Sequence, residues 1–490
     1  MHTSSIKKFF LQYSQFLGAG IVSQLLGFIT FPVLTRYLNT EQYGMLSLVT
    51  TTMLLSVAIA KAGLSDGIIR MYKEYDATQE MRNMFSSTIM VRGVILALIT
   101  TFIYIAIIPA ITNYLKINKQ YVICFLIMAA YLLIRPLNII VSNILRIRGR
   151  TLFLNVSGIF VRILSIIISL FLLMYVIREL YGYFIGIVAG ELILSVILLF
   201  WFFNNYKVGL KQVSGDLTIK LIKFGLPLLL TELSFLLLTY VDRYMILAYR
   251  GESALGLYSA GYNVAMYISD IIIFALSYAI VPIYVEIYSN DGRTKTEEFL
   301  NKSLHYILIV LIPLCVGYYA VSEDLFITLA SRKYLSAASF SPIILVASLF
   351  LGMNNILNAG LYLQKKSTII LSIMLSATII KIVLNIVLLP KHGVMGSAIA
   401  TLISCMAASG LTMYFSFKHI LISVKSKSMV FYILLSAFMC FIVVHISAGT
   451  VWMNLIVKVV VGVIIISFGV LLKEKEILEN IKSMFAVKRA

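Results

Sequence analysis

Eleven charged residues lie inside long apolar stretches of the 490-residue sequence, and they are the side chains best placed to do chemistry. The cations are Lys61, Arg92, Arg135, Arg162, Arg243, Lys381 and Lys458, and the acids are Glu191, Glu232, Asp242 and Asp270. An Arg or Lys at the centre of a membrane helix costs about 2.5–3.5 kcal/mol. Such residues therefore face water, pair with one another or reach toward the membrane surface, and each is a candidate functional group.

The intramembrane charges are predominantly positive, which favours an anionic ligand. We expect Lys61, Arg92, Arg135, Arg162, Arg243 and Lys381 to line a cationic, water-filled cavity, because Arg and Lys suit phosphate oxygens. Arg162 and Lys381 lie nearest to the middle of their stretches and are the preferred anchors. Lys61 and Arg92 lie nearer the predicted cytoplasmic side, so each could instead snorkel, extending its charged group to the membrane surface. Lys458 could do the same on the outer side. Glu191, Glu232, Asp242 and Asp270 are the candidate coupling carboxylates.

The elements that position these residues are predicted to be transmembrane helices. The composition is 60% hydrophobic and only 12% charged, with a mean hydropathy of +0.97, whereas a soluble domain has about 25% charged residues. The apolar runs are long enough to cross ~30 Å of hydrocarbon and do not alternate as barrel strands do. Fourteen spans are predicted: 10–35, 45–66, 85–112, 121–145, 152–177, 181–204, 222–249, 255–288, 303–321, 338–363, 367–389, 393–417, 429–447 and 452–472.

The positions of the cations between the spans predict the topology. With a cytoplasmic N-terminus, 25 of the 40 Lys and Arg residues fall in cytoplasmic segments and 8 in outer segments. This asymmetry places both termini in the cytoplasm. It also accounts for most of the net charge of +19, so the basic composition does not predict a nucleic-acid partner.

Several other classes of function find no support in the sequence. The four cysteines are isolated and the five histidines have no ligand spacing, so neither a disulfide nor a metal site is expected. No phosphate-binding loop or nucleophile motif occurs, and no loop is long enough to hold a soluble domain. We therefore expect no cofactor and no enzymatic activity. Ile477, Ile481 and Phe485 have the spacing of a short amphipathic helix in the tail, although a frayed tail fits equally well.

The sequence contains a weak internal repeat. Shifted by 212 residues, the stretch from Tyr37 to Tyr72 aligns without a gap with the stretch from Tyr249 to Tyr284, and Gly44 then coincides with Gly256. A later match joins YGYFIGIVAGE to HGVMGSAIATL. We predict two pseudo-symmetric six-helix lobes, 1–206 and 207–420, followed by two C-terminal helices in 421–472 and a cytoplasmic tail, 473–490. Parallel repeats are typical of transporters, whose binding site lies where the repeats meet.

Three stretches carry a family resemblance: LTRYLNTEQYGMLSL, YVDRYMILAYRGESALGLYSAGYNVA and HGVMGSAIATLIS. They resemble the first outer turn, the seventh-to-eighth helix segment and the start of the twelfth helix of bacterial polysaccharide transporters. These are the oligosaccharide-lipid flippases of the multidrug/oligosaccharidyl-lipid/polysaccharide exporter superfamily. The resemblance covers nearly the whole chain and implies a flippase for undecaprenyl-diphosphate-linked oligosaccharide, of the kind used for O-antigen, capsule or exopolysaccharide. An ion gradient or the membrane potential would drive alternating access of the two lobes.

Two alternatives remain open at this stage. The first is a cation-coupled multidrug antiporter of the same superfamily, in which an acidic cavity should dominate. The second is a membrane polymerase or ligase acting on the same lipid-linked sugars, which usually has a sizeable outer loop. As a flippase the protein would be a monomer in the bacterial inner membrane. Its partners would be the lipid-linked oligosaccharide, the bilayer and other polysaccharide-assembly membrane proteins.

Overall fold

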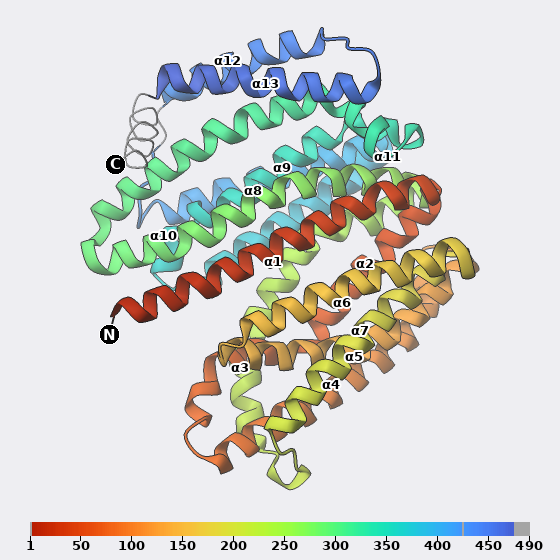
Figure 1. The fold of residues 1–490 in the computed structure, drawn as a ribbon, viewed down its shortest axis with the longest axis vertical. Helices are drawn as coiled ribbons and strands as arrows, with labels where there is room; N and C mark the ends of the chain where they lie inside the picture. The colour runs from red at the N-terminus through yellow and green to blue at the C-terminus, as the bar shows by residue number, and fades with distance from the viewer. Residues whose placement is uncertain (1, 424–425, 475–490) are drawn as a thin grey trace, which may run out of the picture. The chain divides into compact units, whose positions relative to one another are not determined.

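The computed structural model describes residues 2–423 and 426–474, and the side chains of residues 20–273, 280–423 and 428–474. Within these ranges the regular structure is helical throughout (Figure 1). The α-helices are α1 (His2–Tyr37), α2 (Thr40–Lys61), α3 (Leu64–Met71), α4 (Gln79–Tyr114), α5 (Lys119–Ile147), α6 (Thr151–Phe171), α7 (Leu180–Asn205), α8 (Gly215–Leu329), α9 (Ser341–Leu357), α10 (Ala359–Leu363), α11 (Ser367–Ser416), α12 (Ser426–Val444) and α13 (Val451–Lys473). The possible tail helix at 477–485 lies outside the described residues.

Two of these helices contain more than one membrane span. A straight helix as long as α8 would extend for ~170 Å, several times the thickness of a bilayer. Gly251 and Gly292 interrupt α8 with φ of 81° each, and Gly393 interrupts α11 with φ of 59°. Because α2 with α3, and α9 with α10, each form one span, the described helices contain the fourteen predicted spans. The prediction of an all-α membrane protein with about fourteen helices is confirmed.

Cα packing divides the chain into two compact units, 1–259 with 367–400 and 260–366 with 401–490. The first unit contains all the helices from α1 to α7, together with the first segments of α8 and α11. These units do not test the predicted lobes, which are defined by sequence repetition. The boundaries at 206 and 420 therefore stay predictions.

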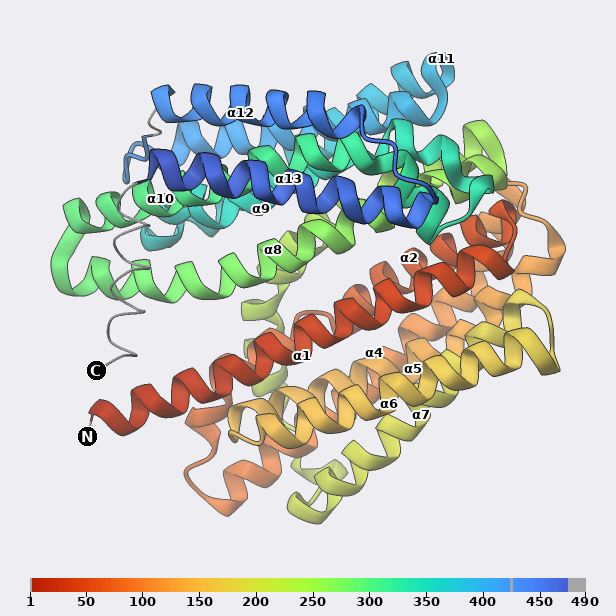
Figure 2. The same cartoon turned by 45° about the horizontal axis from the view of Figure 1, so that its top comes forward.

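In the first unit, α7 packs against α5 and α6, and α4 packs against α5 (Figure 2). The start of α8 belongs to the same core, because Leu217 and Leu221 are buried in one cluster with Leu64 and Ile68 of α3. The segment leading into α8 is fixed to α4: Ser87 Oγ accepts from the Gly209 N–H at 3.0 Å. Residues on both sides of the predicted boundary between the lobes thus pack as one body.

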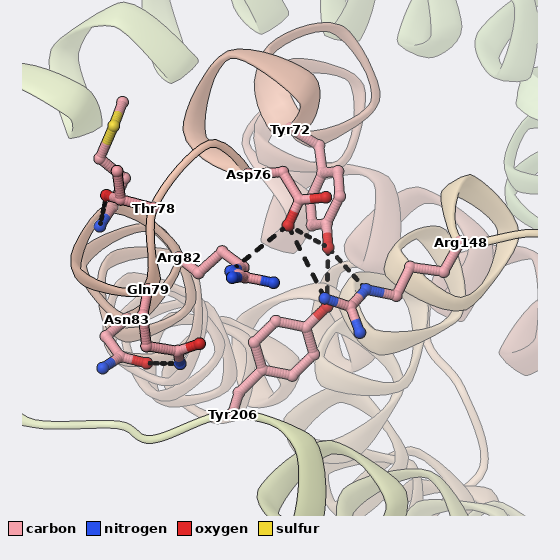
Figure 3. Close-up of polar contacts among 9 residues, drawn as sticks. Tyr72, Asp76, Thr78, Gln79, Arg82, Asn83, Arg148 and Tyr206 are labelled. Atoms are coloured by element: carbon pink, nitrogen blue, oxygen red, sulfur yellow. Dashed lines mark hydrogen bonds and ion pairs between the residues drawn. The ribbon is translucent and has the colours of Figure 1, made fainter.

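A polar cluster fastens the predicted cytoplasmic end of this unit (Figure 3). Arg148 Nε donates to the Tyr72 hydroxyl at 2.7 Å, and its guanidinium lies 4.9 Å above the Tyr206 ring. Asp76 Oδ1 lies 3.7 Å from both Arg148 and Arg82. Burial raises the pKa of Tyr206, which stays a neutral phenol. Tyr72 and Tyr206 are each only 4% exposed, so this cluster stabilises the packing of the helices.

In the second unit, α13 is tied to the third segment of α8. Lys458 Nζ and Asn454 Nδ2 donate to Asp324 Oδ2 at 2.7 and 2.9 Å. The expectation that Lys458 reaches toward the outer surface stays a prediction, and in this structure an ion pair with Asp324 holds its ammonium. At the other end of α13, Glu474 Oε1 accepts a hydrogen bond from the Tyr432 hydroxyl and lies 3.0 Å from His305 Nε2. The antiparallel pair α12 and α13 (Figure 2) is thus anchored at both ends of α13.

Candidate functional site

The outer end of α2 makes a two-fold contact with the turn that Gly251 introduces in α8. A side chain at Gly44 would collide with the Glu252 carbonyl oxygen, and one at Gly256 would collide with the Thr40 carbonyl oxygen. The predicted repeat makes Glu252 the counterpart of Thr40, and Gly256 the counterpart of Gly44. Equivalent residues therefore exchange equivalent contacts, as in an isologous interface. Only glycine permits this approach of two backbones.

Polar contacts reinforce this outer contact. The Thr40 and Ser253 hydroxyl oxygens lie 2.8 Å apart. The Asn118 N–H donates to Glu252 Oε1 at 3.2 Å, although burial still raises the pKa of this carboxyl. Asn39 caps α2 in a reciprocal arrangement with Gln42, which fixes where the helix begins.

Three ion pairs account for half of the predicted cationic residues and three of the predicted carboxylates. Lys61 Nζ lies 2.6 Å from Glu232 Oε1, joining α2 to α8. Arg135 Nη1 lies 3.2 Å from Glu191 Oε1, joining α5 to α7. The third pair is Lys381 with Asp242. Residues assigned to cargo binding and to coupling are thus partners of one another in this structure.

The Lys381–Asp242 pair is fully buried, because both side chains are 0% exposed. Lys381 Nζ lies 2.6 Å from Asp242 Oδ2 and donates to the Leu238 carbonyl oxygen at 2.7 Å. The Tyr258 hydroxyl donates to the same carboxylate oxygen. This pair holds α11 against α8. Lys381, a preferred anchor in the sequence, is therefore not accessible to an anionic cargo in this structure.

The Arg135–Glu191 pair is partly accessible and belongs to a hydrogen-bonded network. The Arg135 side chain is 37% exposed and that of Glu191 is 8% exposed. Asn138 Nδ2 donates to Glu191 Oε1 at 2.7 Å, and to the Glu191 carbonyl oxygen at 3.2 Å. Asn138 thereby satisfies the buried carboxylate and leaves the guanidinium of Arg135 as the accessible partner.

Three further predicted residues have other surroundings. Arg243 is 3% exposed, and its Nε donates to Ser47 Oγ of α2 at 2.8 Å. Arg243 and Asp242 thus interact with different helices, as their adjacent positions predict. Arg92 Nε donates to the Thr218 hydroxyl at 3.3 Å. Asp270 is half-buried and belongs to the second compact unit, whereas the other three carboxylates belong to the first.

Arg162 differs from all of these residues. Its side chain is exposed, although it lies about 17 Å along α6 from Thr151. Within the described part of the chain it forms no hydrogen bond or ion pair. It interacts electrostatically with Tyr131 of α5 and Tyr183 of α7, and Tyr131 also interacts with Arg135.

We call Tyr131, Arg135, Arg162, Tyr183 and Glu191 the α5–α7 cationic cluster. It has two guanidinium groups and one carboxylate, so its net charge is positive. Arg135 and Arg162 both retain accessible donors, and two phenol groups adjoin them. This arrangement can receive an anion with several acceptor oxygens. The charges of this cluster were predictable from the sequence, but both tyrosines and Asn138 were not, because their only signal is polarity within an apolar run.

The polysaccharide biosynthesis protein family matches residues 14–288, more than half of the chain, and the MatE family matches residues 227–387. An uncharacterized membrane protein of Methanocaldococcus jannaschii is 28% identical over 365 residues, covering 69% of this chain and 70% of its own. Lsg locus putative protein 1 of Haemophilus influenzae is 25% identical over 215 residues, covering 41% of this chain and 53% of its own.

Solved structures share the fold. The lipid II flippase MurJ in an inward closed conformation is similar with a TM-score of 0.75 and 16% identity, covering 96% of this chain and 98% of its own. An inward-facing multidrug resistance MATE transporter of the MOP superfamily is similar with a TM-score of 0.66 and 15% identity. The match covers 83% of this chain and 94% of that transporter. The chain therefore belongs to the polysaccharide biosynthesis protein family, and it is a multi-pass membrane protein with the fold of these transporters.

Proposed function

We propose that the protein flips a lipid-linked oligosaccharide, carried on undecaprenyl diphosphate, from the cytoplasmic to the outer leaflet of a bacterial inner membrane. The observation that carries this proposal is Arg162, an exposed guanidinium within a membrane span, beside an Arg135 that is also accessible. An arginine in hydrocarbon is costly, so Arg162 needs water or an anion. A diphosphate supplies acceptor oxygens whose geometry matches a guanidinium fork.

The polyprenyl chain and the sugar head group of the cargo need no dedicated charged site. The polyprenyl chain stays in the bilayer while the head group crosses along a hydrated path. The membrane potential favours this direction, because an inside-negative potential drives an anion outward with about 2.3 kcal/mol per charge for each 100 mV. Each of Glu191, Glu232 and Asp242 forms an ion pair with a cation of the protein. We therefore favour the potential over a carboxylate-bound coupling ion.

A multidrug antiporter is the second candidate, and the MatE match to residues 227–387 supports it. Its cargo would be an organic cation, which an exposed carboxylate would attract. In the described part of the first unit, the three intramembrane acids are each paired with a cation, whereas Arg162 is not. The charge distribution thus favours an anion over a cation.

Reconstitution of the purified full-length protein in liposomes tests the proposal. We expect a fluorescent undecaprenyl-diphosphate oligosaccharide on one leaflet to become accessible on the other faster than in protein-free liposomes. We expect no proton-driven accumulation of a cationic dye. Dye accumulation without flipping would replace the flippase with the antiporter.

A disulfide across the outer contact should stop transport. The Thr40 and Ser253 oxygens are 2.8 Å apart, so cysteines at both positions lie within bonding reach. If the cargo leaves by separation of α2 from α8 at this end, oxidised Thr40→Cys/Ser253→Cys protein should not flip its substrate, and a reductant should restore activity. Each single cysteine variant is the control. Equal flipping by the oxidised and reduced double variant would contradict an outer exit at this contact.

A further inference from the structure

The span formed by α2 and α3 is broken where it crosses α8. Ala62 and Gly63 have φ of 45° and 73°, so the helix stops at Lys61 and begins again at Leu64. On α8, Gly225 packs backbone to backbone against Gly63, and Pro227 follows two residues later. Proline has no N–H to donate, so α8 loses one helical hydrogen bond at this level. Two weakened helices therefore lie in contact at the same depth.

The contacts on the two sides of this break differ in kind. On the α3 side, Ile68 and Leu221 are fully buried in one hydrophobic core. On the α2 side, the Lys61–Glu232 pair lies directly beside the break. Among the described residues, the next hydrogen bond between α2 and α8 joins Thr52 to Tyr244, more than two helical turns away. An ion pair therefore holds the two helices together just above a hinge.

This ion pair is accessible to water and to a competing anion. The side chains of Lys61 and Glu232 are 16% and 37% exposed, whereas Lys381 and Asp242 are both fully buried. Lys61 Nζ donates to both carboxylate oxygens, at 2.6 and 2.9 Å, and also interacts with the nearby Asp66 carboxylate. Solvent screens an exposed pair, so it is weak compared with a buried one. Glu232 can also be hydrated if its partner leaves.

We infer that Lys61 and Glu232 form a latch that the diphosphate of the cargo opens. A diphosphate carries more negative charge than a carboxylate and competes with Glu232 for the Lys61 ammonium. When Lys61 binds the diphosphate instead, the ion pair that joins α2 to α8 beside the break at Ala62 and Gly63 is lost. The two helices then separate along residues 52–61 of α2. Lys61 thus has two roles, as a cargo ligand and as the cation of the latch. This inference rests on the proposed flippase function.

Hydrogen exchange of the full-length protein in lipid nanodiscs tests the latch. The reporters are the amides at the break, where Ala62 N–H bonds to the Ile59 oxygen and Gly67 N–H bonds to the Gly63 oxygen. Undecaprenyl diphosphate should speed their exchange by roughly two- to fivefold, the factor by which loss of an exposed ion pair shifts an opening equilibrium. Undecaprenol, with the same tail and no charge, should have no effect. If inorganic pyrophosphate also speeds the exchange, the latch recognises the diphosphate and does not need the lipid tail.

Variants separate the latch from general loosening. Glu232→Gln and Lys61→Gln should exchange at the faster rate without ligand, and undecaprenyl diphosphate should add nothing. Tyr244→Phe is the matched control, because it removes a neutral α2–α8 hydrogen bond to Thr52 and should leave the ligand response intact. The latch is refuted if undecaprenyl diphosphate leaves wild-type exchange unchanged, if undecaprenol acts equally, or if Glu232→Gln exchanges as slowly as wild type.

Flipping measured on the same preparations distinguishes the two proposals. A protein that flips lipid-linked oligosaccharide while its exchange ignores the diphosphate refutes the latch and leaves the flippase standing. A protein whose exchange responds without any flipping refutes the flippase and retains a diphosphate-sensitive latch.

Discussion

Replacing Arg162 with alanine is expected to lower flipping of a lipid-linked oligosaccharide by roughly 10- to 150-fold, the range for losing a hydrogen bond to a charged group. The side chain is exposed and forms no contact that holds the fold together, so the variant should reach the membrane in normal amounts. Arg162→Lys should keep part of the activity, because it retains the charge and loses only the fork geometry. The measurement is the flipping rate in proteoliposomes, corrected for the amount of folded protein.

Two comparisons make this result specific. Arg150→Ala removes an exposed arginine just before the same helix and should flip at the wild-type rate. Arg162→Glu should be the least active variant, because it replaces attraction for a diphosphate with repulsion. Normal flipping by Arg162→Ala and Arg162→Glu would remove the α5–α7 cationic cluster from the transport path.

Replacing Lys381 with alanine is expected to destabilise the protein by about 3–5 kcal/mol, because it leaves the fully buried Asp242 carboxylate without its cation. The double variant Lys381→Met/Asp242→Asn removes both charges and should recover most of this loss. Tyr258 can still donate to the amide oxygen at position 242. The measurement is thermal unfolding in detergent, followed by the fraction of protein that remains monodisperse.

The double variant also decides why Lys381 matters. If it is as unstable as Lys381→Ala, the loss comes from packing rather than from an uncompensated charge. If Lys381→Ala is as stable as wild type, Asp242 is neutral in the folded protein and the buried ion pair does not form. Flipping by a stable double variant would show that cargo does not need a cation at position 381.

The fold was predictable from the sequence because a bilayer imposes a local rule. Each span needs a long apolar run, so the helices could be located without any knowledge of their neighbours. The exact limits depended on packing. The predicted ninth span stops at residue 321, yet the helix continues to Leu329 and so includes Asp324, the partner of Lys458. Ala62 gives no sign in the sequence of its left-handed conformation.

The arrangement of the candidate site was much less predictable. Lys61 and Glu232 are 171 residues apart, and Arg135 and Glu191 are 56 apart, so spacing alone could not pair them. The sequence also did not show which of these charged side chains are buried. Arg162 and Lys381 lie near mid-span in the same way, but one is exposed and the other is fully buried. Charge within an apolar run identifies a residue that needs a partner, and only the packing of helices shows whether protein or water supplies it.

The contact between the two equivalent outer turns bears on how such a chain could arise. Gly44 meets the counterpart of Thr40, and Gly256 meets Thr40 itself. A single-lobe ancestor would make the same contact between two identical copies, as a symmetric dimer. Gene fusion would then have joined two halves that already fitted, and one mutation in the ancestral turn would have appeared on both sides of the contact at once. After such a fusion each half could change separately, while a side chain at either Gly44 or Gly256 would still collide with the backbone of the other turn.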